Sequence, residues 1–220
     1  MFSSMRSPAA CAALAALFFT AGCRSANYQR RPARVKASGA VVFIPLRDGE
    51  NFYFDADGGV AIARAATRAL DNNASRVEAA DFARARGPLR TMILEDKIAV
   101  GQWARIAREA GADYLVHGSL DRVAWVDPMD QTVPRCTFTI TYAVVRAAEP
   151  AEVYRTTVSG AYPVNVIADR GVTVYEMGHE GLRTNAYDYI GTLIARTFYT
   201  HTLNIFEARG LTEGPDMASR

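Results

Sequence analysis

Residues 137–145 alternate strictly between polar and apolar side chains, and this alternation constrains the fold more than any other part of the chain. The polar positions are Thr137, Thr139 and Thr141, and the apolar ones are Phe138, Ile140, Tyr142 and Val144. Successive side chains of a strand point to opposite faces, so the pattern predicts a strand with one buried and one wet face. A turn at Glu149-Pro150 and a second strand over 153–162 would complete an antiparallel hairpin.

Helical and strand patterns alternate along the rest of the chain. The continuous apolar run at 39–46 is typical of a strand buried on both faces. Apolar and small residues at helical spacing predict amphipathic helices over 60–70 and 100–110, the second ended by Gly111. Further expected elements are a short strand at 75–79, two short helical pieces within 81–97, a strand at 112–126, an irregular stretch at 163–181 and a long helix at 182–206. The order predicts an α/β (α+β) fold with a mixed, partly antiparallel sheet and helices packed mainly on one face.

The charge distribution argues against a nucleic-acid-binding body. Six of the 25 basic residues and none of the 23 acidic ones precede residue 37, so the rest of the chain carries a formal charge of −4. A phosphate track needs clustered positive charge, which the body lacks. With 220 residues, half of them apolar, the composition is that of an ordinary globular protein with one domain.

The first 23 residues predict export and lipidation. An uncharged apolar run at 9–19 is too short to span a bilayer but fits the hydrophobic region of a secretory signal. It ends in Thr20-Ala21-Gly22-Cys23, which resembles a bacterial lipobox, and the resemblance implies that Cys23 carries the lipid. The alternative is a plain secretory signal cleaved near Ala21 or Gly22, which leaves Cys23 an ordinary thiol.

These features divide the chain into four expected parts. They are a lipoprotein signal peptide at 1–22, a lipidated Cys with a basic tether at 23–38, a single periplasmic α/β domain at 39–206 and a flexible tail at 207–220. Arg24 follows the lipobox where Asp would retain a protein of the enterobacterial type in the inner membrane. The resemblance therefore implies an anchor in the outer membrane, on its periplasmic face.

The segment Ala110–Ser119, AGADYLVHGS, resembles a motif of a group of periplasmic modules. This group contains the amino-terminal domain of TolB, the periplasmic part of the curli secretion lipoprotein CsgG, and LpoB, a lipoprotein activator of a penicillin-binding protein. The likeness covers about residues 39–163. It implies an anticodon-binding-like, TolB-N-like fold, in which Gly111 ends a helix and Gly118 allows close packing of a strand.

The resemblance also implies a function by binding. We expect a non-catalytic protein-binding module in cell-envelope assembly or regulation, with an envelope protein as partner and homo-oligomers possible. One alternative is an oligomeric secretion-pore component of the CsgG kind. Another is an uncharacterised periplasmic hydrolase with a dispersed site at Ser119, His117 and His179.

No motif predicts a metal, a cofactor or an enzyme. The segment Asp55–Gly59 resembles a calcium loop, but the ligand positions further along hold Gly59, Val60 and Ala66. The three histidines and Cys136 lack metal-ligand spacing, and no phosphate-binding glycine motif is present. Cys136, within a strand pattern, is expected to be a buried structural thiol.

Three residues are candidate contacts with a partner protein. Trp125 lies at the end of a strand beside Asp127-Pro128, where an exposed aromatic ring could anchor a partner. Asp127 and His179 lie in stretches expected to be irregular, and long irregular segments are often functional.

Overall fold

The computed structural model describes residues 28–48, 57–86, 89, 98–126, 135–164 and 174–214. Its strands are β1 (Tyr28–Arg31), β2 (Gly39–Phe43), β3 (Arg47–Asp48), β4 (Val77–Ala79), β5 (Tyr114–Val126), β6 (Arg135–Arg146), β7 (Ala151–Tyr162), β8 (His201–Asn204) and β9 (Thr212–Glu213). Its helices are α2 (Asp57–Asn73), η1 (Phe82–Ala85), α4 (Val100–Glu109), α5 (Val174–Ala195) and α6 (Ile205–Gly210).

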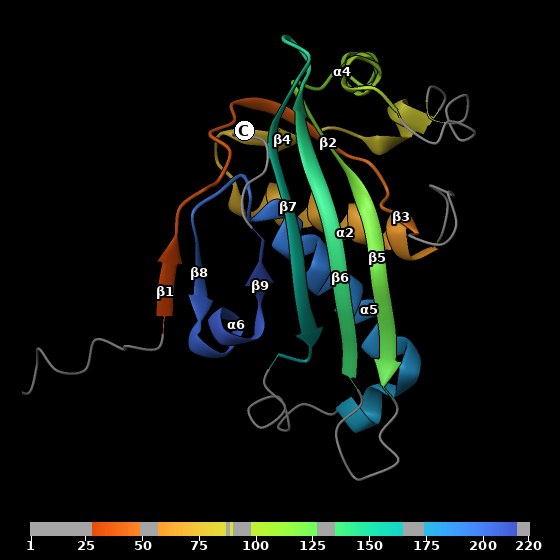
Figure 1. Ribbon diagram of the computed structural model, residues 1–220, viewed down its shortest axis with the longest axis vertical. Helices are drawn as coiled ribbons and strands as arrows, with labels where there is room; N and C mark the ends of the chain where they lie inside the picture. Colours follow the sequence, from red (N-terminus) through yellow and green to blue (C-terminus); the bar gives the residue numbers. More distant parts are fainter. Residues whose placement is uncertain are drawn as a thin grey trace, which may run out of the picture.

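A seven-stranded mixed sheet in the order β4-β2-β5-β6-β7-β9 forms the centre, with β3 beside β5 (Figure 1). β2 pairs in parallel with both β4 and β5, and β5, β6 and β7 form a long antiparallel meander. The predicted hairpin is therefore confirmed, and β6 and β7 pair from Cys136↔Tyr162 to Arg146↔Ala151. β1 and β8 form a separate antiparallel ribbon.

The alternation along the strands divides the core between the two faces of this sheet. On one face, the apolar side chains of β6 pack against the two long helices α2 and α5. On the other face, the short elements α4 and η1 cover the ends of β2, β5 and β6 around Val42, Leu115 and Val145. The predicted α/β fold with a mixed sheet, and with its two long helices on one face, is confirmed.

Two glycines of the resemblance motif fill the roles expected of them. Gly111 follows α4 with a φ of 72°, a conformation that favours glycine. At Gly118 in β5, a Cβ atom would lie 2.2 Å from the carbonyl oxygen of Thr141 in β6. Any larger side chain would therefore force these two strands apart.

The segment 28–38, expected as part of a tether, belongs instead to the fold. Residues 28–31 pair with 201–204, and the backbone amides of Arg34 and Val35 both donate to the carbonyl of Thr197, at 2.9 and 3.0 Å. Val35 is buried in the core formed with α2 and α5. A strand that pairs with residues about 170 positions away needs no local apolar pattern of its own, so the sequence of this segment did not indicate a strand.

The end of the chain also differs from the expected long helix and flexible tail. α5 begins at Val174, inside the stretch expected to be irregular, and ends at Ala195. The chain then turns into β8 and α6, where Asn204 caps the helix by accepting from the Glu207 amide at 2.8 Å. β9 continues the sheet beside β7, so residues 207–214 are part of the fold.

The contact between α2 and α5 depends on Gly191. A Cβ atom there would lie 2.6 Å from both the Ala65 Cβ and the Ile62 carbonyl oxygen on α2. Gly101 on α4 provides a control, because a Cβ atom there would have no neighbouring atom within 4 Å. Substitution of these two helical glycines should therefore change the free energy of unfolding in opposite directions.

We expect Gly191→Ala to lower the free energy of unfolding by about 1–3 kcal/mol, because the helices must separate. Gly101→Ala should leave it unchanged or raise it by up to about 1 kcal/mol, because alanine favours the helix. Urea unfolding of the two variants beside the wild type measures both effects. Equal destabilisation by the two substitutions would contradict the close helix contact.

Candidate functional site

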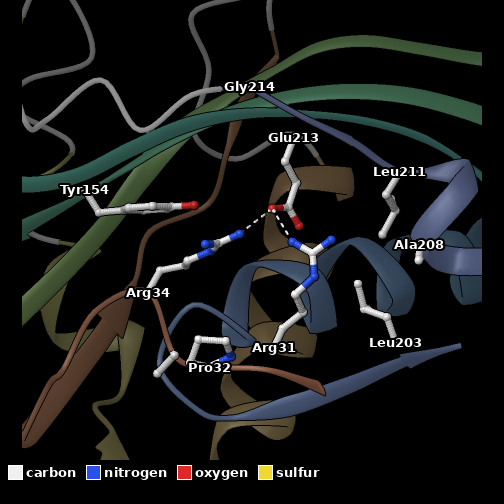
Figure 2. A pocket seen from close by; sticks show the side chains of 10 residues that line it. Arg31, Pro32, Arg34, Tyr154, Leu203, Ala208, Leu211, Glu213 and Gly214 are labelled. Carbon is white, nitrogen blue, oxygen red and sulfur yellow. Dashed lines mark hydrogen bonds and ion pairs between the residues drawn. The ribbon is translucent and has the colours of Figure 1, made fainter. Parts of the chain in front are cut away.

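A cavity of about 640 Å³ lies between the β1–β8 ribbon, α6 and β7. Its lining comes from five parts of the fold, and we call it the arginine pocket (Figure 2). The lining residues are Arg31, Pro32, Ala33, Arg34, Tyr154, Leu203, Ala208, Leu211, Glu213 and Gly214. The pocket thus exists only because the segments 31–34 and 203–214 come together beside β7.

Two arginines share one carboxylate inside this pocket. The Arg34 guanidinium donates from Nη2 to Glu213 Oε2 at 2.9 Å, and Arg31 Nη1 lies 3.9 Å from the same oxygen. Figure 2 shows both guanidinium groups directed at Glu213 from β1 and from the turn that follows it. All three side chains are 30–41 % exposed, so these pairs contribute little to folding stability.

One side of the pocket is formed by the aromatic ring of Tyr154, which leads into the core. Tyr154 of β7 lines the pocket and packs against Tyr142 of β6, with ring centroids 6.0 Å apart. Behind it, the buried Tyr142 hydroxyl and the Thr197 hydroxyl are joined by a 2.9 Å hydrogen bond. Burial raises the pKa of Tyr154, which Arg34 lowers in part, so its phenol is neutral. Tyr154 therefore adds a hydroxyl and an apolar ring beside the arginines.

The pocket carries a net positive charge and can bind an anionic group. Arg31 and Arg34 present more donors than the single Glu213 carboxylate can accept, and guanidinium groups bind carboxylates in bidentate fashion. None of the lining residues is a Ser, Thr, Cys, His or Lys, so the pocket offers no common nucleophile beside a base. The arrangement therefore suits recognition of a carboxylate or phosphate rather than group transfer.

Sequence reasoning missed this site because its members carry no shared motif. Arg31 and Arg34 fell in the expected tether and Glu213 in the expected tail. Their pairing follows from the β1–β8 and β7–β9 contacts, which join segments about 170 and 50 residues apart. The one available signal was the basic cluster itself, which sequence reasoning assigned to the tether.

The structure places the predicted site residues in separate locations. Trp125 lies at the end of β5, is 40 % exposed, and packs edge-to-face on Tyr187 of α5 with ring centroids 6.0 Å apart. His179 lies within α5 rather than in a loop, because the helix begins five residues earlier. Cys23 and Asp127 lie outside the described residues. None of these residues lines the arginine pocket.

His117 and Ser119 do not form a nucleophile–base pair. The Ser119 hydroxyl donates to Asp121 Oδ1, and the His117 ring stacks on Trp103 with centroids 4.3 Å apart. Burial, together with the charges of Arg155 and Arg47, lowers the pKa of His117 to about 3. A histidine held neutral in this way packs against α4 as part of the sheet, and its Nε2 atom has no hydrogen-bond partner among the described residues.

Cys136 is fully buried, and burial raises the pKa of its thiol to about 12, as expected of a structural thiol. Within the described ranges, no three His, Cys, Asp or Glu side chains gather as metal ligands. No helix in these ranges is long and apolar enough to cross a membrane.

Comparison with known proteins gives only distant structural likenesses. No protein-family model and no curated protein matches the chain. Its fold is similar to a subunit of the PelC dodecamer from Paraburkholderia phytofirmans, with 11 % identity over 78 % of this chain and 98 % of that one, at a TM-score of 0.41. It is also similar to the hypothetical protein CT253 from Chlamydia trachomatis, with 11 % identity over 74 % and 98 %, at 0.46.

LpoB, named in the sequence resemblance, is among the similar structures. Its C-terminal domain from Escherichia coli shares 13 % identity over 56 % of this chain and 82 % of that one, at a TM-score of 0.36. Likeness at this level says nothing about activity or partners. The wider resemblance to TolB and CsgG stays a prediction from the sequence.

His117 predicts a pH dependence of stability. The unfolded chain binds a proton at this histidine below about pH 6.5, but the folded chain does not until about pH 3, so stability falls as the pH drops through this window. The contribution of this residue alone should lower the free energy of unfolding by about 2 kcal/mol between pH 7.5 and pH 5. His117→Phe, which keeps an aromatic ring against Trp103, should remove this contribution to the pH dependence of stability. Urea unfolding at both pH values tests this, and an unchanged pH dependence in the variant would contradict it.

Proposed function

We propose that this chain is an outer-membrane-anchored periplasmic lipoprotein that acts as a non-catalytic protein-binding module in cell-envelope assembly or regulation. The observation that carries the binding role is the arginine pocket, in which Arg31 and Arg34 share Glu213. The anchoring role is supported by the apolar run at 9–19 and by the lipobox-like Thr20–Cys23. Lipid attachment at Cys23 would hold the protein at the membrane without a spanning helix.

The edge of β7 supports an extended protein segment as the occupant of the pocket. Among the described residues, β9 pairs with β7 only at Val158 and Ser159, and the stretch from Ala151 to Thr156 has no strand partner on that side. Such an edge can accept an added strand through its main-chain hydrogen bonds. Tyr154 lies within this stretch and lines the pocket, so a strand added here would pass the two arginines.

Charge selects the kind of segment that would bind. An Asp, a Glu or a terminal carboxylate on the added strand would compete with Glu213 for Arg31 and Arg34. Backbone pairing would supply affinity, and the acidic group would supply specificity and orientation. We therefore propose an acidic segment of an envelope protein, or of a second copy of this chain, as the partner.

The sequence candidates Trp125, Asp127 and His179 belong to a second proposed contact. Trp125 is one of three large apolar side chains that stay well exposed among the described residues. It lies near the end of β5, and the strands β6 and β7 separate β5 from β9, which lines the arginine pocket. A partner that spans the sheet could touch both places.

We expect Arg31→Gln/Arg34→Gln to weaken partner capture at least about tenfold, because charge-assisted hydrogen bonds to the acidic group are lost. The measurement is photo-crosslinking in intact cells from a photoreactive residue at Ala33, which lines the pocket. A crosslinked species at twice the mass of the mature, lipidated chain would indicate a second copy, and any other discrete mass an envelope partner. Crosslinking that is equal in the variant and the wild type would overturn the pocket's role.

Two control variants separate recognition from folding. Arg76→Gln removes an exposed arginine before β4, outside the pocket, and should leave the crosslink unchanged. Glu213→Gln removes the competing carboxylate and should strengthen the crosslink, whereas a purely structural role of the ion pairs predicts that it weakens it. Membrane fractionation of Cys23→Ala tests the anchor separately, since loss from the outer membrane is the expected result.

A further inference from the structure

The end of the molecule that carries β1 and α6 has an outward face opposite the arginine pocket. Along β1, Gln29 and Arg31 turn toward the pocket side, where Arg31 contacts Glu213. Tyr28 and Arg30 therefore point the other way, because side chains alternate along a strand. Tyr28 is 65 % exposed and pairs through its backbone with Asn204, directly before α6.

α6 adds a second aromatic side chain and a further cation to this end. Phe206 is 49 % exposed, and Arg209, three residues later, lies on the same side of the helix and is also exposed. Among the described residues only Tyr28, Phe206 and Trp125 are large apolar side chains with substantial exposure. Two of the three therefore gather where β1 meets α6. We call Tyr28, Arg30, Phe206 and Arg209 the outer patch.

The acidic residues near this patch are directed inward. Glu207 of α6 is buried and pairs with Arg196 at 3.0 Å, and Glu213 pairs with the pocket arginines. Arg30 and Arg209 have no acidic partner among the described residues. The outward charge of this end is therefore positive, and it lies beside exposed aromatic rings.

The proposed lipid site lies very close to this patch in the sequence. Only four residues separate Cys23 from Tyr28, so the connecting chain spans no more than about 17 Å even when fully extended. That is shorter than the tether expected from the sequence, because residues 28–31 are held in the fold by β8. A lipid at Cys23 would hold the start of β1 close to the headgroups, within a few screening lengths of about 8 Å.

We propose that the outer patch rests on the anionic surface of the membrane that holds the lipid anchor. The proposal builds on the anchoring at Cys23 given above. Tyr28 and Phe206 would sit at the headgroup level, where aromatic rings are enriched, and Arg30 and Arg209 would bind anionic lipid phosphates. This contact fixes the orientation of the protein, with the arginine pocket opening away from the patch and reachable for a partner.

The experiment uses the full lipidated protein in nanodiscs, with hydrogen–deuterium exchange of residues 28–31 and 205–210 as the readout. In discs that contain phosphatidylglycerol, these amides should exchange about tenfold more slowly than in detergent, because the docked face excludes water. In discs of phosphatidylcholine alone, the slowing should largely disappear. Equal exchange in both kinds of disc and in detergent would overturn the proposal.

Variants identify the side chains responsible. Arg30→Gln/Arg209→Gln should reduce the equilibrium constant for docking about thirtyfold, which corresponds to ~2 kcal/mol at 1.4 kcal/mol per factor of ten, and most of the protection should be lost. Tyr28→Ser/Phe206→Ser should also reduce it while leaving the charge unchanged. The matched control Arg76→Gln/Arg105→Gln removes two exposed arginines from other parts of the fold and should retain full protection. Equal loss in the control would overturn the proposed patch.

Three further outcomes distinguish failure of this proposal from failure of the lipid anchor on which it rests. Intact mass spectrometry reads the lipid at Cys23 independently, so a free thiol there would refute the anchor and the surface contact together. A lipidated protein without protection at the patch would refute only the surface contact and leave the anchored binding module standing. Protection that appears in detergent and rises with protein concentration would show that the patch is an interface between two copies, which overturns the membrane contact.

Discussion

The pairing of β5 with two different neighbours is the constraint on which the rest of the structure depends. On one side β5 runs parallel to β2, and on the other it runs antiparallel to β6 in the long meander. Parallel strands need a helix to return the chain between them. Because the connection from β2 to β4 and the one from β4 to β5 run in opposite directions along the sheet, right-handed crossovers put α2 and α4 on opposite faces. Gly118 permits this arrangement, because any side chain there would collide with β6.

At the β7 edge of this sheet, segments from early and late in the chain, 28–34 and 201–214, are folded together. β9 covers a short part of β7, and the β1–β8 ribbon stands beyond it (Figure 1). The space between them is the arginine pocket, whose charges come from both segments. In our proposals, the partner binds on one side of this ribbon and the membrane contacts the other. The proposed anchoring and the proposed recognition would therefore both depend on the same small ribbon.

The sequence predicted the central fold well and its periphery poorly, for a physical reason. The alternation of 137–145, the apolar run at 39–46 and the helical spacing over 60–70 all report burial, and each corresponds to an observed element. β1 and β9 are short and mostly exposed, and the four-residue β8 buries only Leu203, so burial leaves no periodic trace in them. Their stability comes from backbone pairing with distant residues, which composition does not record. The pocket was missed for the same reason.

By itself, the sequence determined the class of fold and the buried faces of its strands and helices, because burial imposes a pattern on neighbouring residues. It also placed Cys136 in the core. Only the tertiary structure decided that Arg31, Arg34 and Glu213 meet, and that Tyr28 and Phe206 lie at one end. Contacts of that kind depend on how remote segments return to one place, and each residue alone is compatible with many partners.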